Sequence, residues 1–405
     1  MLRVDLRNAK PGMTLALPVP NPKAPNQVLL RVGYSLTDSI LTKLEELETR
    51  CVWVDYPALD YLREYIDPAQ QAAKGEVLSQ ITSVFAECQE SSTAKLDYDQ
   101  YTQSIGGLID NILANPKTAL FMNNLTGEQG EDDLMRHSAA VTHLSLLIGL
   151  RLEGYLVRQR KRVAPERAKE VTSLGVGAML HDLGLSLLPP AVRNHYLETG
   201  DESDPSYREH TALGFRTVRG QIEPSAATIL LNHHQRYDGT GFAGKNLPVL
   251  EGESIHIFAR IVGAAAHFER MKHPPGLDER PAVFVLGAML SEPTVQQFDP
   301  QVLRALVEVT PPFPPGTVVR LSDDRWAATI DHDAAEPCRP KLQALPPPDQ
   351  IDPNDPELGE VIDLRQEPAT LRIVEADGQP VEEFLFDGER VPGNEALADG
   401  WGASV

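Results

Sequence analysis

One stretch decides the fold class of this chain: DLMRHSAAVTHLSLLIGL, residues 133–150. Its positions His137, Val141 and Leu144 follow the i, i+4, i+7 spacing of one helix face. Helical periodicity, broken only by short Gly and Pro turns, continues to about Val309 with no alternating strand pattern. The middle of the chain is therefore predicted to be an all-α helical bundle.

Smaller modules are predicted on both sides of this bundle. Before it, VLLRV at 28–32 and CVWVDY at 51–56 are rich in β-branched and aromatic residues and predict strands. Thr37 or Asp38 can cap a helix between them. After the bundle, GTVVRL at 316–321 begins a β-hairpin around a polar turn, and further short strands follow a Pro-rich linker. The fold class is multidomain and mainly α, with the bundle between a small α+β domain and a small β module.

We expect five segments along the chain. They are a small N-terminal α+β domain at 1–60, a helical linker at 61–125, the helical domain at 126–309, a small β module with a Pro-rich linker at 310–387, and a loose tail at 388–405.

Composition excludes several classes of protein. The chain has 37 Lys plus Arg against 58 Asp plus Glu, a formal charge of −21, so no basic excess exists for nonspecific binding to nucleic acid. Three distant cysteines, Cys51, Cys88 and Cys338, argue against a disulfide framework and for a reducing compartment. No apolar run reaches the roughly 18 residues of a membrane span. We expect a soluble, cytoplasmic protein.

Four elements of the bundle carry histidines and acids on or beside their apolar faces. They are Asp133 with His137, His181 with Asp182, His210, and His233 with His234. A single histidine so placed is more often a hydrogen-bonded core residue than a ligand. Four such elements in one bundle favour a polynuclear metal site, because imidazole and carboxylate groups are ligands of divalent metals. The turn at Asp238, Gly239 and Gly241 adds backbone that a substrate can approach closely.

The order of these motifs resembles the HD-GYP branch of the HD phosphohydrolases, which are metal-dependent phosphodiesterases that open cyclic di-GMP. The residues that carry the resemblance are His137, HDLG from His181, His210, and HHQRYDGTGF from His233, within about residues 100–290. The leading segment LRVDLRNAKPGMTLALPV is similar to the small domain that precedes many HD-GYP modules.

The resemblance implies a ligand set, a metal and a reaction. The implied ligands are Asp133, His137, His181, Asp182, His210, His233 and His234. Two or three divalent ions, iron or manganese, are expected there, with Asp182 as the bridging ligand. Bound ions would lower the pKa of a bridging water and stabilise charge on the phosphate. Arg236 would clamp a phosphate or a guanine edge; an ion pair with Asp238 is an equally good reading of Arg236.

The sequence departs from the family pattern at three places. Leu185 stands where the HDxGK motif has lysine, and Gly241, Phe242 and Ala243 stand where the family has GYP. Ala266 falls on the position of the last metal-binding aspartate. His267 follows it directly, although a shift of one residue rotates a helical side chain by about 100°.

Two functions from different classes remain open at this point. The first is a cyclic di-GMP phosphodiesterase in bacterial second-messenger signalling. The second is a degenerate relative that binds a nucleotide or a partner protein without hydrolysis, which the losses at Leu185, Ala243 and Ala266 support. A third reading, an HD hydrolase of nucleoside phosphates, is disfavoured by the HHQRYDGTGF loop. The expected ligand is a cyclic dinucleotide, and a signalling partner and a homodimer stay open, with neither bulk nucleic acid nor a membrane expected.

Overall fold

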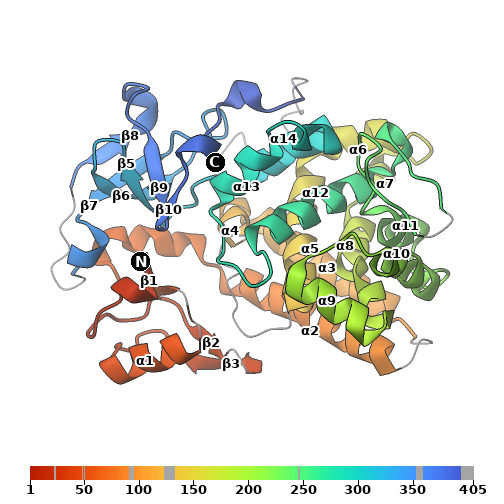
Figure 1. Ribbon diagram of the computed structural model, residues 1–405, viewed down its shortest axis with the longest axis horizontal. Helices are drawn as coiled ribbons and strands as arrows, with labels where there is room; N and C mark the ends of the chain where they lie inside the picture. Colours follow the sequence, from red (N-terminus) through yellow and green to blue (C-terminus); the bar gives the residue numbers. More distant parts are fainter. Residues whose placement is uncertain are drawn as a thin grey trace.

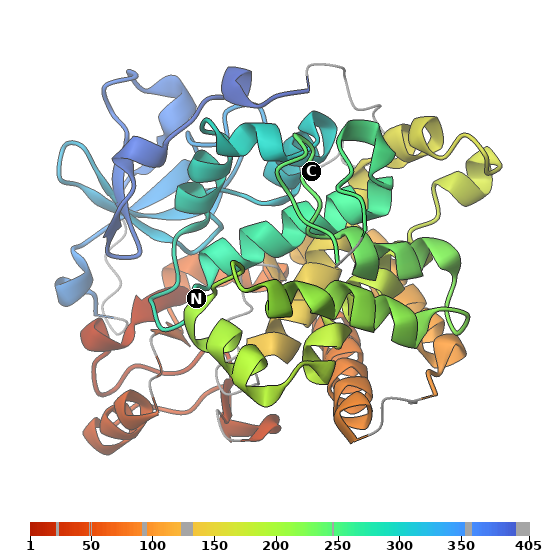
Figure 2. The same cartoon turned by 45° about the vertical axis from the view of Figure 1, so that its right-hand side comes forward.

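The computed structural model describes residues 1–21, 24–47, 49, 51–90, 95–122, 133–244, 247–352 and 359–393. A large helical body is accompanied by two smaller modules, one from each end of the chain, which lie on the same side of it (Figures 1 and 2). The predicted fold class, multidomain and mainly α, is confirmed. The predicted domain boundaries themselves stay predictions, and residues 91–94 and 123–125 of the predicted linker lie outside the described residues.

The described residues of the N-terminal module form two antiparallel strand pairs, a short 3-10 helix and one α-helix. Strand β1 (Leu2–Asp5) pairs with β4 (Cys51–Val54), and β2 (Val19–Asn21) pairs with β3 (Ala24–Leu30). Helix α1 (Asp38–Glu46) begins after Thr37, whose side chain accepts a hydrogen bond from the Ile40 backbone N–H. The predicted helix and second strand are confirmed, whereas the first strand begins earlier than predicted and ends at Leu30.

The helical body begins after the 3-10 segment η2 (Pro57–Tyr65). Its α-helices are α2 (Pro68–Glu90), α3 (Tyr98–Ala114), α4 (Pro116–Met122), α5 (Asp133–Arg151), α6 (Glu153–Gln159), α7 (Pro165–Ala168), α8 (Thr172–Leu180), α9 (Pro190–Thr199), α10 (Pro205–Val218), α11 (Pro224–Asn232), α12 (Ile257–Lys272), α13 (Ala282–Met289) and α14 (Pro300–Val309). The 3-10 helix η3 (Leu183–Leu187) follows α8.

Helix α5 is the centre of the helical core. It packs against α2, α8, α12 and α14, and most of its residues between Leu134 and Gly149 are buried. Apolar burial contributes about 25 cal/mol per Å² removed from water, so a helix covered on most sides is held firmly in place. The first histidine of the predicted cluster is therefore carried on a fixed element.

Two glycines let α8 approach its neighbours closely. A Cβ at Gly175 would lie 2.5 Å from the Ile105 side chain of α3, and a Cβ at Gly177 would lie 2.8 Å from the Ala226 carbonyl oxygen of α11. Neither position has room for a side chain. Helix α8 is thereby wedged between these helices, and its C-terminal end reaches the middle of the bundle.

The C-terminal module is a six-stranded antiparallel sheet with the order β10-β9-β5-β6-β7-β8. Its strands are β5 (Val318–Leu321), β6 (Trp326–Asp331), β7 (Lys341–Leu345), β8 (Val361–Asp363), β9 (Ile373–Ala376) and β10 (Gln379–Pro380). The predicted hairpin is β5 and β6, paired with Val318 opposite Ala328. Of the predicted tail, Gly388–Arg390 form a 3-10 helix, and residues 394–405 lie outside the described residues.

A cavity of about 1010 Å³ lies where the three parts meet. Arg3 of β1 lines it and forms ion pairs with Glu279, at 3.1 Å, and with Asp377, at 2.7 Å. The residues that line it do not include the predicted metal ligands. Within the described ranges, no single helix is long and apolar enough to cross a membrane; the bent pair α5 and α6 passes that test together, by length and composition only.

Candidate metal centre

Six buried side chains from four parts of the helical body meet in one place. His137 comes from the second turn of α5, and His181 ends α8. Asp182 lies between α8 and η3, and α10 carries His210. The pair that follows α11 completes the group. These six residues are His137, His181, Asp182, His210, His233 and His234, and we call them the histidine–aspartate cluster.

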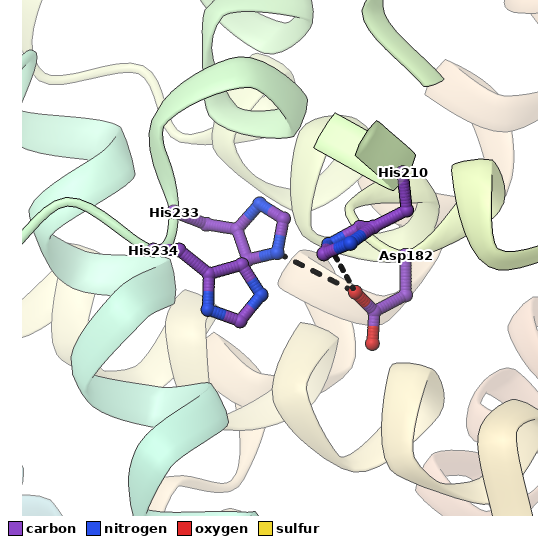
Figure 3. Close-up of side chains that lie close together, drawn as sticks. All are labelled: Asp182, His210, His233 and His234. Carbon is purple, nitrogen blue, oxygen red and sulfur yellow. Dashed lines mark ion pairs between the residues drawn. The ribbon is translucent and has the colours of Figure 1, made fainter. Parts of the chain in front are cut away.

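Asp182 is the centre of this cluster because each of its oxygens faces different histidines. Its Oδ1 lies 3.6 Å from His210 Nε2 and 3.4 Å from His233 Nε2. Figure 3 shows both ion pairs meeting at the same oxygen, with the other oxygen directed away. That second oxygen, Oδ2, lies 3.7 Å from His137 Nε2 and 3.4 Å from His181 Nε2.

The cluster therefore has two halves that share one carboxylate. Asp182, His210, His233 and His234 form the first half, and His137, His181 and Asp182 form the second. Within each half the candidate ligand atoms lie within 4.8 Å of one another, a spacing from which they can reach a common metal ion.

The backbone fixes which ring nitrogen of each histidine faces Asp182. The Nδ1 of His181 lies 2.8 Å from the Ala178 carbonyl oxygen, and the Nδ1 of His210 lies 2.7 Å from that of Tyr207. His233 makes the same contact with the carbonyl of Ile229 at 3.2 Å. A carbonyl oxygen only accepts, so each Nδ1 carries the hydrogen and each Nε2 presents a lone pair to the cluster.

These lone pairs are the observation that tests the fit of a metal. The Nε2 atoms of His181, His210 and His233 and the Oδ1 of Asp182 are buried and have no hydrogen-bond partner. Buried polar atoms without partners are costly, and lone pairs that face one another repel. A cation between them removes both costs, so the residues present fit a divalent metal ion.

Burial keeps the imidazoles in the form that binds metals. It lowers the pKa of His137 and of His210 to about 4, and it lowers that of His233 as well. For Asp182, burial acts in the opposite direction, but the neighbouring His181 and His233 hold its pKa well below the ordinary value. Neutral imidazoles around an ionised carboxylate are the expected state near neutral pH.

One predicted ligand, Asp133, does not join the cluster. Its side chain is 70% exposed at the start of α5, and its partner is Arg136, 3.5 Å away on the next turn. Glu269 of α12 makes the contact with His137 instead, through the Nδ1 of the ring. With its side chain facing solvent, Asp133 is not brought to the cluster in this structure, and its role as a metal ligand stays a prediction.

The predicted substrate loop lies next to the cluster without contributing to either half. A Cβ at Gly241 would collide with the His234 carbonyl, so this glycine lets the loop fold back against the cluster. Gly239 has a φ of 78°, which glycine adopts without strain. The Asp238 side chain accepts hydrogen bonds from Thr240, and the guanidinium of Arg236 lies 5.7 Å from the centre of the Phe298 ring.

Sequence reasoning missed two residues of α12 beside the cluster. Glu269 accepts hydrogen bonds from His137, Arg136 and His273, and the Nη2 of Arg270 lies 3.9 Å from Asp182 Oδ2. The available signal in the sequence was the adjacent pair Glu269 and Arg270 in a helix that is otherwise mainly apolar. The ring of His267, which the sequence left open as a substitute ligand, lies 5.1 Å from that of Phe298 and belongs to neither half.

Comparisons with known proteins show which sequences this chain resembles. The sequence model of the HD domain family matches residues 137–302. The chain is 24% identical over 294 residues to the cyclic di-GMP phosphodiesterase PA4108 of Pseudomonas aeruginosa, covering 68% of this chain and 61% of that protein. It is 28% identical over 142 residues to the cyclic di-GMP phosphodiesterase response regulator RpfG of Xanthomonas campestris, covering 34% and 36%.

A solved structure, Bd1817, an HDG"Y"P protein from Bdellovibrio bacteriovorus, matches with a TM-score of 0.44 and 17% identity over 75% of this chain and 97% of that one. The chain thus spans between about one third and two thirds of the length of the two curated relatives.

Proposed function

The chain is an HD-GYP domain protein, and on this premise we propose that it is a metal-dependent phosphodiesterase that hydrolyses cyclic di-GMP. The HD-GYP family is one of phosphodiesterase hydrolases, and two relatives named cyclic di-GMP phosphodiesterases are similar to this chain. The observation that carries the proposal is the set of buried, unpartnered lone pairs around Asp182. The binding-only alternative is less well supported, because six of the seven implied ligands lie together.

The proposed cofactor is divalent iron or manganese, held by the histidine–aspartate cluster. Imidazole and carboxylate ligands suit both metals. A bound divalent ion supplies a hydroxide near neutral pH and charge stabilisation for the phosphate. The sequence predicts two or three ions, whereas only two ligand groups, which share Asp182, occur in the described part of the chain.

The protein's own residues supply orientation and charge. The carbonyls of Ala178, Tyr207 and Ile229 hold three imidazole rings in place, so that the rings need not reorganise when a ligand arrives. Arg236 is our proposed clamp for a phosphate or guanine edge, from the loop that also contains Asp238, Gly239 and Gly241. Because the cluster residues are buried, charges there are weakly screened, which strengthens each of these interactions.

The test is turnover of cyclic di-GMP by the purified protein loaded with manganese, or with iron under reducing conditions. We expect hydrolysis to linear products, followed by chromatography. His181→Ala should lose at least 100-fold in kcat/KM and most of the bound metal. The matched control is His195→Ala, because His195 is an exposed histidine of α9 that pairs with Asp201 and lies outside the cluster. Metal-loaded protein that leaves cyclic di-GMP intact would refute the proposal.

The wider setting also belongs to this proposal. A cyclic dinucleotide is the proposed ligand, and a cytoplasmic location is the proposed place of action. A signalling partner and a homodimer remain as predicted from the sequence.

A further inference from the structure

Helix α12 presents three neighbouring positions to the second half of the cluster. Ala266, Glu269 and Arg270 follow i, i+3, i+4 spacing and so share one helix face. Glu269 binds the His137 ring, and Arg270 lies opposite Asp182. Ala266 carries only a methyl group and is partly buried against the core. Because helical side chains point toward the N-terminus of their helix, the long side chain of Arg270 reaches back across the turn of Ala266.

Arg270 is held in this position by its surroundings. Its guanidinium lies over the ring of Tyr196, 5.1 Å from the centroid, which is the geometry of a cation–π contact. The side chain as a whole is 20% exposed, but its Nη2 is buried and has no hydrogen-bond partner. That atom lies 3.9 Å from Asp182 Oδ2, which is too long for a hydrogen bond. The Nη2 of Arg270 is thus a positively charged donor that faces the cluster and makes no hydrogen bond to it.

The two halves of the cluster consequently differ in charge. The first half offers the Oδ1 of Asp182 and three imidazoles, with no cationic side chain paired to that oxygen among the described residues. In the second half, Oδ2 faces two imidazoles and the Arg270 guanidinium. A divalent ion bound to Oδ2 would lie beside this fixed positive charge in a buried, weakly screening environment.

Among the described residues, the second half also has no further carboxylate that is free to coordinate such an ion. Asp133 faces solvent, and Ala266 has no ligand atom. Glu269 is already committed to Arg136, His137 and His273. In the second half, the shared carboxylate of Asp182 is therefore the negative group that would have to balance both the Arg270 guanidinium and a divalent ion, with two neutral imidazoles beside it.

We propose that the site holds one divalent ion per chain, in the half formed by Asp182, His210, His233 and His234, and that Arg270 is the fixed cation of the other half. This inference rests on the proposed function, because that function requires a bound metal. It adds which groups supply the positive charge that faces the phosphate. In hydrolysis the unsatisfied Nη2 donates to a phosphate oxygen of the dinucleotide beside the ion, a role suited to a planar guanidinium.

The experiment counts metal ions. Each protein is loaded with excess Mn²⁺, freed of unbound metal, and measured by elemental analysis and by electron paramagnetic resonance, which separates an isolated Mn²⁺ from a coupled pair. Wild type should hold one ion with the isolated spectrum. The double variant Ala266→Asp, Arg270→Ala replaces the cation with a carboxylate and should hold two ions with a coupled spectrum.

Single variants test whether the positive charge at position 270, rather than the side chain at position 266, sets the number of bound ions. Ala266→Asp alone should still hold one ion, because the new carboxylate pairs with Arg270. Arg270→Lys keeps a cation and should also hold one ion. The matched control is Arg136→Ala, which removes a neighbouring arginine that faces Glu269 rather than Asp182, and it should leave the count at one.

Two ions in wild type, or one ion in the correctly folded double variant, would overturn the assignment of Arg270. The wild-type count decides the matter even where the double variant does not fold. Turnover of cyclic di-GMP is scored separately: a one-ion protein without turnover refutes the proposed function alone, and an active two-ion protein refutes the arginine assignment alone. A protein that takes up no Mn²⁺ refutes both.

Discussion

At the scale of single residues, Glu269 is the buried acid on which three basic side chains depend. It accepts from Arg136 and His273 at 3.0 Å each, and it also binds His137. Burial opposes its ionised form, but His137 and His273 hold its pKa well below the ordinary value. A carboxylate that is ionised at this depth is stabilised only through these partners.

The first prediction follows from those partners. Glu269→Gln should lower the free energy of unfolding by about 3 kcal/mol, because it leaves the largely buried Arg136 without its counter-charge and takes the carboxylate acceptor away from the His137 and His273 rings. Glu153→Gln is the matched control: Glu153 pairs with Lys169 on the surface and should cost less than about 1 kcal/mol. The measurement is urea unfolding of metal-free protein at neutral pH. Equal shifts in the two variants would contradict the prediction.

His143 of α5 supports a prediction about pH. Its Nε2–H donates to the Ala119 carbonyl oxygen at 3.0 Å, and burial lowers its pKa to about 3. The unfolded chain has the ordinary value near 6.5, so below that pH the unfolded state takes up a proton that the folded state refuses. The contribution of His143 to stability is therefore complete above about pH 6.5 and is lost progressively as the pH falls toward 3.

His143→Gln keeps a donor and removes this titration. Between pH 7 and pH 5, wild type should lose about 2 kcal/mol more stability than the variant, since 1.5 pH units at 1.36 kcal/mol each separate pH 5 from 6.5. Urea unfolding with a chelator present at both pH values measures the difference without a contribution from bound metal. Parallel losses in the two proteins would show that His143 does not titrate in this way.

At the scale of elements, the contact between η3 and α10 sets the geometry of the first half of the cluster. A Cβ at Gly184 would collide with the His210 carbonyl and lie 2.8 Å from the Gly214 backbone nitrogen. Backbone atoms on both sides leave no side chain that can give way. The close approach of these two segments is what brings Asp182 within ion-pair distance of His210.

Gly184→Ala should consequently force η3 and α10 apart. We expect a loss of about 2 kcal/mol in stability and a clear drop in retained metal. The matched control is Gly107→Ala in α3, where a Cβ would meet nothing within 4 Å; in a helix interior this change should stabilise by up to about 1 kcal/mol. Thermal unfolding and metal content of both variants measure the contrast, and a neutral Gly184→Ala would disprove the packing argument.

The elements were predictable from sequence to the extent that their signals are local. Helical periodicity identified α5, Thr37 identified the start of α1, and the alternating segments identified the β5–β6 hairpin. The contact between His137 and Glu269 was not predictable, because Glu269 lies 132 positions further along the chain and reaches the ring only through the docking of α12 on α5. The same docking places Arg270, rather than His267, opposite Asp182.

At the scale of the whole molecule, the formal charge of −21 repels an anionic nucleotide. Attraction must therefore come from positive charge at the proposed site itself. In our proposal one divalent ion, Arg270 and Arg236 supply that attraction inside an acidic protein. The modules themselves were predicted from local strand and helix patterns, but their joint docking was not, because it rests on contacts between residues several hundred positions apart.

A chain of ion pairs connects that docking to the cluster. Arg3 of the N-terminal module binds Asp377 of the β module and Glu279 of the helical body. Glu279 lies 3.6 Å from His273, which in turn binds Glu269 beside His137. Three parts of the molecule therefore meet through one arginine.

Arg3→Ala should weaken this junction and little else. Two carboxylates, each about one quarter exposed or less, would lose a partner at hydrogen-bond distance, and we expect a cost of about 2 kcal/mol, less than for a fully buried pair. Calorimetry should show the loss as an unfolding transition that broadens or separates in two, because the modules no longer unfold with the helical body. Arg7→Ala is the matched control: its side chain is 83% exposed and pairs with Asp5 alone among the described residues, so the transition should stay single and shift by less than about 0.5 kcal/mol. If Arg3→Ala and Arg7→Ala unfold alike, the junction at Arg3 does not couple the three parts.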